Sequence, residues 1–216
     1  GCQNLALATY PNDPNRLLAA GFVEAAGKSY LGVFLSSNAG TDWTQVKILN
    51  EAGSWADSVA LAPSDVGTIY VGGRRYPSCA PAFFRSTNGG SSWTQVGAPC
   101  QYGSINSIAV HRTLKTTLYA ASDYDGIAKS TDGGTSWTKL TKAPFGGTCV
   151  VINPSNPNEV FVGGGQGVHY SADGGATWSD LSAGLPAKYV TSIVIDGAAR
   201  LVYAGTAGGG ICRRSF

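Results

Sequence analysis

The stretch Ser130-Thr131-Asp132-Gly133-Gly134-Thr135-Ser136-Trp137 decides the fold, because three further stretches of the chain repeat its pattern, Ser-x-Asp/Asn-x-Gly-x-x-Trp. Asp or Asn followed by Gly favours a tight turn, since the side-chain oxygen accepts hydrogen bonds from later amides and the glycine adopts a positive φ. We therefore expect each copy to be the turn of a β-hairpin, with its tryptophan packed between neighbouring sheets. The key positions of the four copies are Ser36, Asn38, Gly40 and Trp43; Ser86, Asn88, Gly90 and Trp93; Ser130, Asp132, Gly134 and Trp137; and Ser171, Asp173, Gly175 and Trp178.

These stretches resemble the Asp-box, or BNR repeat, of a β-propeller superfamily that includes sialidases, xyloglucan-cleaving glycosidases, sortilin-type receptors and photosystem II assembly factors. The resemblance covers nearly the whole chain and implies a structural role for the turns. Asn38 and Asn88 stand where the family has Asp, a replacement that suits a turn better than a reaction that needs a carboxylate. By analogy, the resemblance also implies that ligands bind at the face away from the turns.

The spacing of the repeats predicts the blades of a propeller. The four tryptophans are 50, 44 and 41 residues apart, and each interval holds four short strand patterns. We expect one all-β domain over 1–216, a five-bladed β-propeller of four-stranded antiparallel blades whose last blade is incomplete. The expected blades are approximately 4–50, 57–99, 106–143, 148–184 and 191–216. Small residues in the first strand of each blade suit the crowding around a narrow axis.

The ends of the chain leave the closure of the ring open. The fifth unit stops at Phe216, where its turn would begin, so its fourth strand is missing. Three alternatives follow: the fifth blade is three-stranded, a short N-terminal segment closes the ring, or the chain is a piece of a larger propeller. An exposed edge on the fifth blade would favour pairing with another chain.

Composition excludes several classes of partner. The net charge of +2 gives no case for binding nucleic acid or an anionic membrane surface. No apolar run approaches the ~20 residues that span a bilayer, so membrane insertion is not expected. The sequence contains no Met and no signal peptide, which indicates a mature or trimmed chain.

The five cysteines leave at least one thiol unpaired within the chain. We expect a disulfide between Cys79 and Cys100, which flank the second turn, and another between Cys2 and Cys212, which a closed ring would bring together. The alternative for each cysteine is a small buried hydrophobic residue. Few charges and these disulfides indicate an extracytoplasmic protein, either secreted, periplasmic or on the cell surface.

The loops expected at the face away from the turns, among them a long loop over 23–31, are rich in aromatic and polar side chains, a combination that suits sugars. Trp55 is the only tryptophan outside a turn. The alternative is that each tyrosine covers its own loop and the charges keep the surface soluble. Four polar residues of successive blades align at the mouth of the central axis, namely Asp57, Asn106, Thr148 and Thr191. This ring of side chains would hold water or a small cation, or would only solvate the mouth of the channel. The candidate ligand-binding residues are Trp55, Asp57, Arg74, Arg75, Tyr76, Tyr102, Asn106, Tyr124, Asp125 and Tyr189.

The leading functional hypothesis is a non-enzymatic binding or scaffold module that holds a protein partner or a glycan. One alternative is a glycoside hydrolase or a fragment of one, which needs two carboxylates about 5–5.5 Å or 6.5–9.5 Å apart. The other is a structural subunit of a larger assembly. Only Arg74 and Arg75 lie near the expected face, so the three arginines of a sialidase are not matched. His111 and His169 are isolated, and we expect no metal site and no cofactor.

Overall fold

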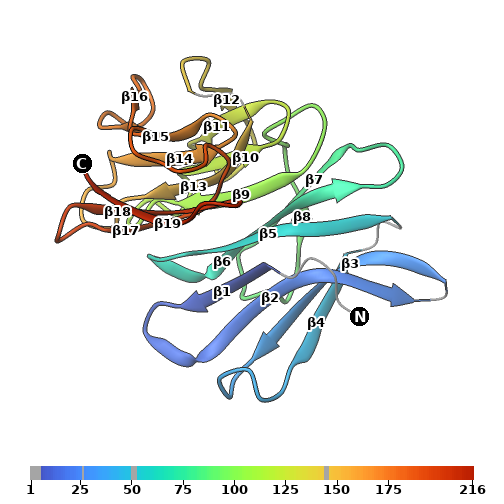
Figure 1. Cartoon of the computed structure of the whole chain (residues 1–216). Helices are drawn as coiled ribbons and strands as arrows, with labels where there is room; N and C mark the ends of the chain where they lie inside the picture. The colour runs from blue at the N-terminus through green and yellow to red at the C-terminus, as the bar shows by residue number, and fades with distance from the viewer. Residues whose placement is uncertain (1–5, 26, 50–52, 144–145) are drawn as a thin grey trace.

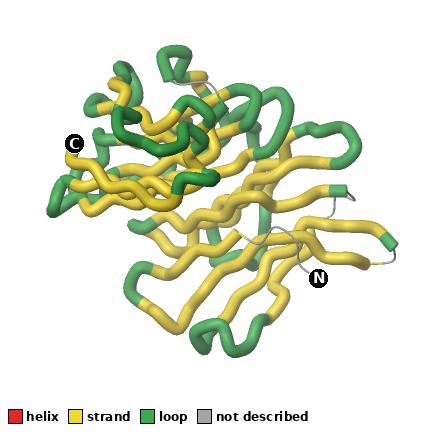
Figure 2. Tube along the Cα trace, in the orientation of Figure 1, coloured by secondary structure: helices red, strands yellow, loops and turns green. Residues whose placement is uncertain are grey.

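The chain is described here by a computed structural model that covers residues 6–25, 27–49, 53–143 and 146–216. Every regular element in these ranges is a β-strand (Figures 1 and 2). The part of the chain described contains no helix long and apolar enough to cross a membrane.

The strands form five antiparallel sheets that follow one another in chain order, as the repeat pattern predicts. The first sheet holds β1 (Ala6–Tyr10), β2 (Asp13–Ala25), β3 (Lys28–Ser36) and β4 (Thr44–Leu49); the second β5 (Ser54–Ala62), β6 (Asp65–Arg75), β7 (Pro81–Ser86) and β8 (Thr94–Gln95); the third β9 (Ile105–Val110), β10 (Leu118–Ser122), β11 (Gly126–Ser130) and β12 (Thr138–Lys139); the fourth β13 (Gly147–Ile152), β14 (Val160–Gly164), β15 (Gly167–Ser171) and β16 (Ser179–Asp180); and the fifth β17 (Val190–Asp196), β18 (Leu201–Thr206) and β19 (Gly210–Ser215).

The four repeated stretches are the expected hairpin turns between the third and fourth strands. In the third sheet, the Ser130 hydroxyl donates to Asp132 Oδ1 at 2.8 Å and accepts the Gly134 amide at 2.9 Å. Gly134 has a φ of 84°, which a residue with a Cβ rarely adopts. Hydrogen bonds from the hydroxyl and amide of Ser136 lower the pKa of Asp132 to about 2. The equivalent contacts recur in the turns that begin at Ser36, Ser86 and Ser171.

The tryptophan of each turn packs against the preceding sheet where one exists. The ring of Trp137 meets Phe83 of the second sheet edge to face, with centroids 5.3 Å apart. Trp93 and Trp178 pack against cores to which the first and third sheets contribute, respectively. Trp43 belongs to the first sheet, has no preceding sheet among the described residues and is 38% exposed. The prediction that these rings lie between sheets therefore holds for three of the four.

Polar side chains connect the inner strands of neighbouring sheets. The Ser58 hydroxyl donates to the Ile105 carbonyl at 2.6 Å, and the Thr148 hydroxyl donates to the carbonyls of Val190 and Gly163. The inner strands pack in chain order, β1 on β5, β5 on β9, β9 on β13 and β13 on β17. Together these contacts fix the relative position of consecutive sheets.

Among the described residues the fifth sheet has three strands, as the first of the three alternatives expects. The N-terminal segment of the second alternative, residues 1–5, lies outside the described residues. Within the described residues, β17 and β1 do not pack against each other as the other inner strands do, and the sheets form an arc (Figure 1). Apolar side chains are consequently exposed on both end sheets, Leu7 on β1 and Val194 on β17.

Two expectations from sequence are wrong in detail. The stretch 23–31, expected to be a long loop, continues the hairpin of β2 and β3, with Ala25 opposite Lys28. The expected disulfide of Cys79 with Cys100 is absent: Cys79 is exposed on its loop, whereas Cys100 points into the core of the second and third sheets. Cys212 is also a free thiol, and its expected partner Cys2 lies outside the described residues.

Candidate functional site

Three of the predicted site residues form a layered stack on the second sheet. Trp55 on β5 is opposite Arg74 on β6, and Tyr76 follows at the end of β6. The rings of Trp55 and Tyr76 stack with centroids 6.0 Å apart and planes 10° from parallel. The Arg74 guanidinium lies 5.1 Å from the centroid of Trp55. Tyr76 is 65% exposed.

Backbone hydrogen bonds hold this stack, which we call the aromatic platform, in place. The Tyr76 amide donates to the Gly53 carbonyl, and the Gly53 amide donates to the Ser29 carbonyl, both at 2.7 Å. A Cβ on Gly53 would lie 2.3 Å from the Tyr76 carbonyl oxygen. Glycine is thus required for this close approach, which connects the β2–β3 hairpin to the platform.

A second group of predicted residues lies next to the platform. Tyr102 and Tyr124 are exposed, and the backbone of Gly103 lies directly against the Tyr124 ring, where a Cβ would be only 2.5 Å from it. The Gly103 amide donates to the Cys79 carbonyl at 2.8 Å, so the loop after Tyr76 contacts the segment that carries Tyr102. The second and third sheets therefore present their exposed tyrosines on one connected set of loops.

The polar candidates of the third sheet make structural contacts. Asp125 accepts the Gln101 amide at 2.6 Å and the Lys139 ammonium at 3.1 Å. These partners, the Gln101 amide foremost, hold the pKa of Asp125 below its usual range although partial burial opposes them. Asn106 donates to Asp123 and to the Gly147 carbonyl.

The remaining candidates are more scattered. Tyr189 is exposed between the fourth and fifth sheets, where its carbonyl accepts the Ala207 amide at 2.9 Å. Asp57 lies on β5 and Arg75 at the end of β6, opposite Ser54. Thr191 donates to the Gly205 carbonyl at 3.1 Å. Three of the four residues expected to ring the channel mouth, Asn106, Thr148 and Thr191, thus donate to main-chain carbonyls.

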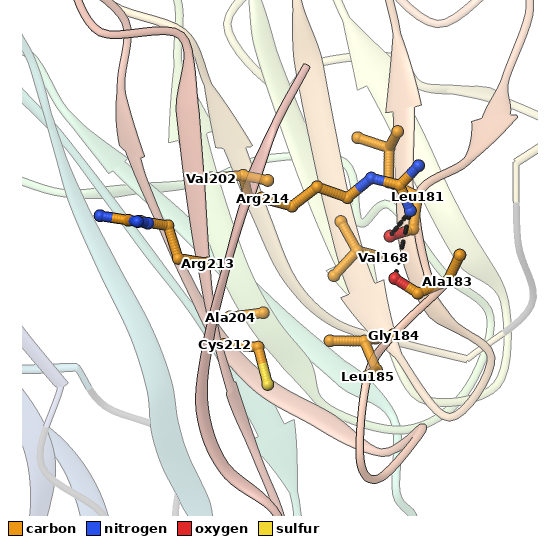
Figure 3. A pocket seen from close by; sticks show the side chains of 10 residues that line it. All are labelled: Val168, Leu181, Ala183, Gly184, Leu185, Val202, Ala204, Cys212, Arg213 and Arg214. Atoms are coloured by element: carbon orange, nitrogen blue, oxygen red, sulfur yellow. Dashed lines mark hydrogen bonds between the residues drawn. The ribbon is translucent and has the colours of Figure 1, made fainter.

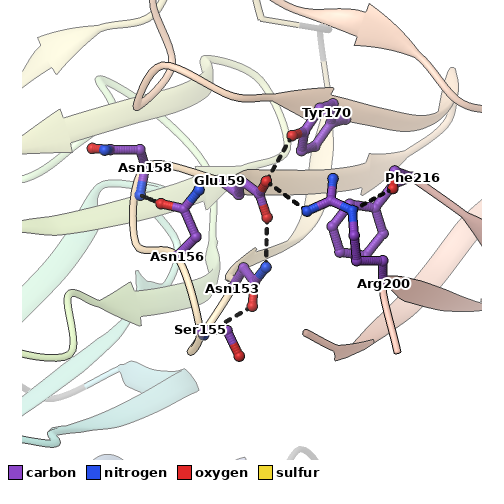
Figure 4. A network of polar contacts seen from close by, with 8 residues as sticks. All are labelled: Asn153, Ser155, Asn156, Asn158, Glu159, Tyr170, Arg200 and Phe216. Atoms are coloured by element: carbon purple, nitrogen blue, oxygen red, sulfur yellow. Dashed lines mark hydrogen bonds and ion pairs between the residues drawn. The ribbon is translucent and has the colours of Figure 1, made fainter. Parts of the chain in front are cut away.

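One polar network was not predicted from the sequence (Figure 4). Glu159 is 4% exposed; its carboxylate accepts from Asn153 and, at 3.1 Å, from the Tyr170 hydroxyl, and pairs with Arg200 at 3.2 Å. Burial by itself would raise the pKa of Glu159, but these hydrogen bonds and the charge of Arg200 outweigh it, and the pKa is lowered. Arg200 also donates to the Phe216 carbonyl at 2.9 Å. The network joins the fourth and fifth sheets and has a structural role.

The described residues contain no group of three or more His, Cys, Asp or Glu side chains placed to hold a metal ion. Burial raises the pKa of the Cys100 thiol to about 11, so this thiol is protonated at neutral pH. The arrangement instead offers aromatic surfaces with a cation and fixed carboxylates beside them.

The chain is similar to several known enzymes, two of which are named as xyloglucanases. No protein-family profile matches the chain. The chain is 28% identical over 155 residues to a probable oligoxyloglucan-reducing end-specific xyloglucanase of Neosartorya fischeri. This alignment covers 64% of the present chain and 19% of the Neosartorya protein. The chain therefore spans about a fifth of the length of this relative.

Solved structures agree on the fold. The GH74 xyloglucanase of Xanthomonas campestris superposes with a TM-score of 0.76 at 18% identity, over 96% of this chain and 35% of that one. An ancestral GH74 enzyme gives a TM-score of 0.69 at 25% identity, over 94% and 27% of the two chains. A luciferin-regenerating enzyme gives 0.67 at 11% identity, over 98% and 78%. These similarities show a β-propeller fold.

Proposed function

We propose that this chain is a glycan-binding segment of a xyloglucanase-like propeller, and that the aromatic platform contacts the sugar chain. The observation that carries the proposal is the stack of Arg74, Trp55 and Tyr76, whose outer ring is exposed and whose backbone is fixed. A pyranose ring has an apolar face and a rim of hydroxyl groups, which match an aromatic ring beside charged and polar groups.

The arrangement of the exposed tyrosines favours an extended ligand. Tyr76, Tyr102, Tyr124 and Tyr189 all belong to loops at the end of the sheets away from the repeated turns, and they come from successive sheets. An oligosaccharide that crosses several sheets would contact more than one of them. The names of the relatives support a β-glucan of the xyloglucan type as this ligand.

The relatives also favour the alternative of a glycoside hydrolase, or a fragment of one, over the non-enzymatic binding or scaffold module that the sequence first suggested. Asp125 is held by Gln101 and Lys139, and Asp123 accepts from Asn106, so both carboxylates have structural partners. We therefore assign glycan binding to this segment and hydrolysis to a longer enzyme of which it forms part. Binding of an extracellular polysaccharide is consistent with an extracytoplasmic location, and the hydrogen bonds of the four turns support membership of the Asp-box superfamily.

Isothermal titration with xyloglucan oligosaccharides tests the proposal, with unbranched cello-oligosaccharides as the comparison ligand. Tyr76→Ala should weaken binding up to about tenfold, because an aromatic contact contributes about 0.5–1.5 kcal/mol and 1.4 kcal/mol is a factor of ten. The matched control is Leu114→Ala, because Leu114 is an exposed apolar residue at the end of the sheets that carries the repeated turns. Its loop contacts the third turn, where the Gly133 amide donates to the Thr116 carbonyl. This control should bind as the unchanged chain does.

Two results separate the alternatives. Equal affinity of the chain and of Tyr76→Ala for the oligosaccharide would refute the platform as the binding surface. Release of reducing ends from xyloglucan by the chain alone, lost on Asp57→Asn, would assign hydrolysis to this segment rather than to a longer enzyme.

A further inference from the structure

A hollow of the third sheet lies beside the loops that carry the exposed tyrosines. It has a volume of about 260 Å³ and is lined by two segments, 125–127 and 139–143. These segments are the beginning of β11 and the end of β12, so the hollow lies at the end of the sheet away from the repeated turn. The exposed Tyr124 directly precedes the first segment. The hollow is therefore at the same end of the sheets as the aromatic platform.

The lining of this hollow combines apolar and charged side chains. Ile127, Leu140 and Ala143 supply apolar surface. Asp125 and Lys139 also line the hollow and form an ion pair, with Nζ 3.1 Å from Oδ1. A sugar ring has an apolar face and a rim of hydroxyl groups, and this lining offers a counterpart to each.

The carboxylate of Asp125 is held in place by the protein itself. Its Oδ2 accepts the Gln101 amide at 2.6 Å, and the Asp125 amide donates to the Ser122 hydroxyl at 3.2 Å. A carboxylate has about four positions that accept hydrogen bonds, so a ligand hydroxyl can join the donors already present. A group that is fixed in advance costs little ordering when a ligand binds.

The fourth sheet does not offer the same space. Val168 and Leu181 hold the places of Ile127 and Leu140 there, and they line a hollow of only about 40 Å³ (Figure 3). In that sheet the Ser182 hydroxyl accepts the Val168 amide at 3.1 Å and lies 3.4 Å from the Val168 carbonyl oxygen. The serine thus occupies space beside the strand end. Of these two hollows, only the one in the third sheet has room for a ring.

We propose that the hollow of the third sheet is a second sugar site, which binds a single pyranose unit between the pair of Asp125 and Lys139 and the apolar side chains. Its volume of about 260 Å³ lies just below the ~300–1,000 Å³ of pockets that hold drug-sized ligands, which suits a ligand with one ring. The carboxylate accepts one ring hydroxyl and the ammonium donates to the next.

Two sources supply such a unit: a branch of the glycan bound at the platform, and the terminal unit of another sugar chain. The choice of a sugar as the ligand rests on the glycan binding proposed above. The site itself shares no residue with the platform of Trp55, Arg74 and Tyr76, so each can be tested without the other.

Titration of the isotope-labelled chain with methyl xyloside, followed by NMR, tests the site directly. The amide signals of Gly126, Ile127 and Thr141 should shift and saturate. Signals of Trp55 and Tyr76 report on the platform in the same spectra, so a failure of this site is distinguished from a failure of the proposed function. Cyclohexylmethanol, which has a six-membered ring without ring hydroxyls, is the comparison ligand and should not saturate the hollow.

Variants of the lining make the test specific. Lys139→Met removes the ammonium and keeps an apolar side chain, and should weaken binding about tenfold or more, because a hydrogen bond from a charged group is lost. Lys142→Met is the matched control, since Lys142 is exposed and lies outside the lining, and it should bind as the unchanged chain does. Ala143→Phe fills the hollow and should abolish binding. Circular dichroism verifies that each variant is folded.

Isothermal titration with branched and unbranched oligosaccharides separates the two sources of the unit. If Ala143→Phe lowers the affinity for the branched oligosaccharide alone, the bound unit is a branch. If it changes neither affinity but abolishes the binding of methyl xyloside, the bound unit is the end of another chain.

Three results would overturn the proposal. The first is the absence of saturable shifts at Gly126 and Thr141 with methyl xyloside. The second is equal affinity of Lys139→Met and Lys142→Met for this ligand. The third is a set of shifts confined to Trp55 and Tyr76, since this would assign the sugar to the platform.

Discussion

The stability of this fold should depend on Trp137 far more than on Trp43, although the two residues hold the same position in their turns. Each indole donates to the carbonyl of the glycine three residues before it, Trp137 to Gly134 at 3.2 Å and Trp43 to Gly40 at 3.1 Å. Trp137 alone also donates to the carbonyl of Gly97 and packs on Phe83. The two alanine substitutions therefore differ by the contribution of one contact between sheets.

The structure gives the expected magnitudes. Truncation of a buried tryptophan costs about 3–5 kcal/mol. Trp137 is half-buried, so we expect about 3 kcal/mol for Trp137→Ala, including about 1 kcal/mol for the bond to Gly97. Trp43 lacks the preceding sheet, and we expect about 1 kcal/mol for Trp43→Ala. At about 2–4 °C per kcal/mol for a chain of this size, the melting temperature should fall by about 6–12 °C and about 2–4 °C.

Thermal unfolding of both variants, followed by circular dichroism and checked by calorimetry, measures the difference. If the two substitutions lowered the melting temperature equally, the tryptophans would act within their own turns, and the assignment of Trp137 to the contact between the second and third sheets would be refuted.

Three further predictions concern charge and close packing. Glu159→Gln should reduce the free energy of unfolding by about 1–2 kcal/mol in urea titrations at pH 7, since it removes the ion pair with the half-exposed Arg200. Because the pKa of Glu159 is lowered on folding, its stabilising contribution is complete above the unfolded-state pKa of 4.5 and is lost as the pH falls through the folded-state pKa. Glu159→Gln should therefore lose less stability in acid than the unchanged chain does. Identical dependence of stability on pH in the two proteins would contradict this. Asp132→Asn should leave the stability at pH 7 nearly unchanged, because two of the four turns already carry Asn. The unchanged chain should lose stability as the pH falls from 3.8 towards about 2, where Asp132 is protonated, and the variant should lack this loss. Acid titration of the folded fraction measures the difference. Gly73→Ala should cost at least about 1–3 kcal/mol and weaken oligosaccharide binding, because its Cβ would lie 1.7 Å from the Trp55 carbonyl oxygen; calorimetry and titration of one sample would measure both.

The fold could be predicted from the sequence because its defining contacts are local. The hydrogen bonds among Ser130, Asp132 and Gly134 span at most four residues, so the pattern of residue types alone predicts the hairpin. The full length of β2 and β3 could not be predicted in this way, because the two strands remain paired as far as Glu24 and Ser29, where the sequence no longer has a strand pattern.

The contacts that depend on tertiary structure were not predictable in this way. The pair of Glu159 and Arg200 joins residues that are 41 positions apart and belong to different sheets. The disulfide between Cys79 and Cys100 was a reasonable inference from spacing, but the direction of the Cys100 side chain depends on the packing of the core. The candidate site was predicted as a set of loops, and the structure resolves which of these residues stack, namely Trp55, Arg74 and Tyr76.

The packing of each sheet on its chain neighbours alone has a mechanical consequence. Among the described residues, the second, third and fourth sheets each pack on a neighbour at both flanks, so each should resist thermal opening more than a sheet with a single packed neighbour. Trp55, Tyr76 and Tyr124 belong to the second and third sheets. Support on both flanks should therefore limit the motion of these candidate binding residues.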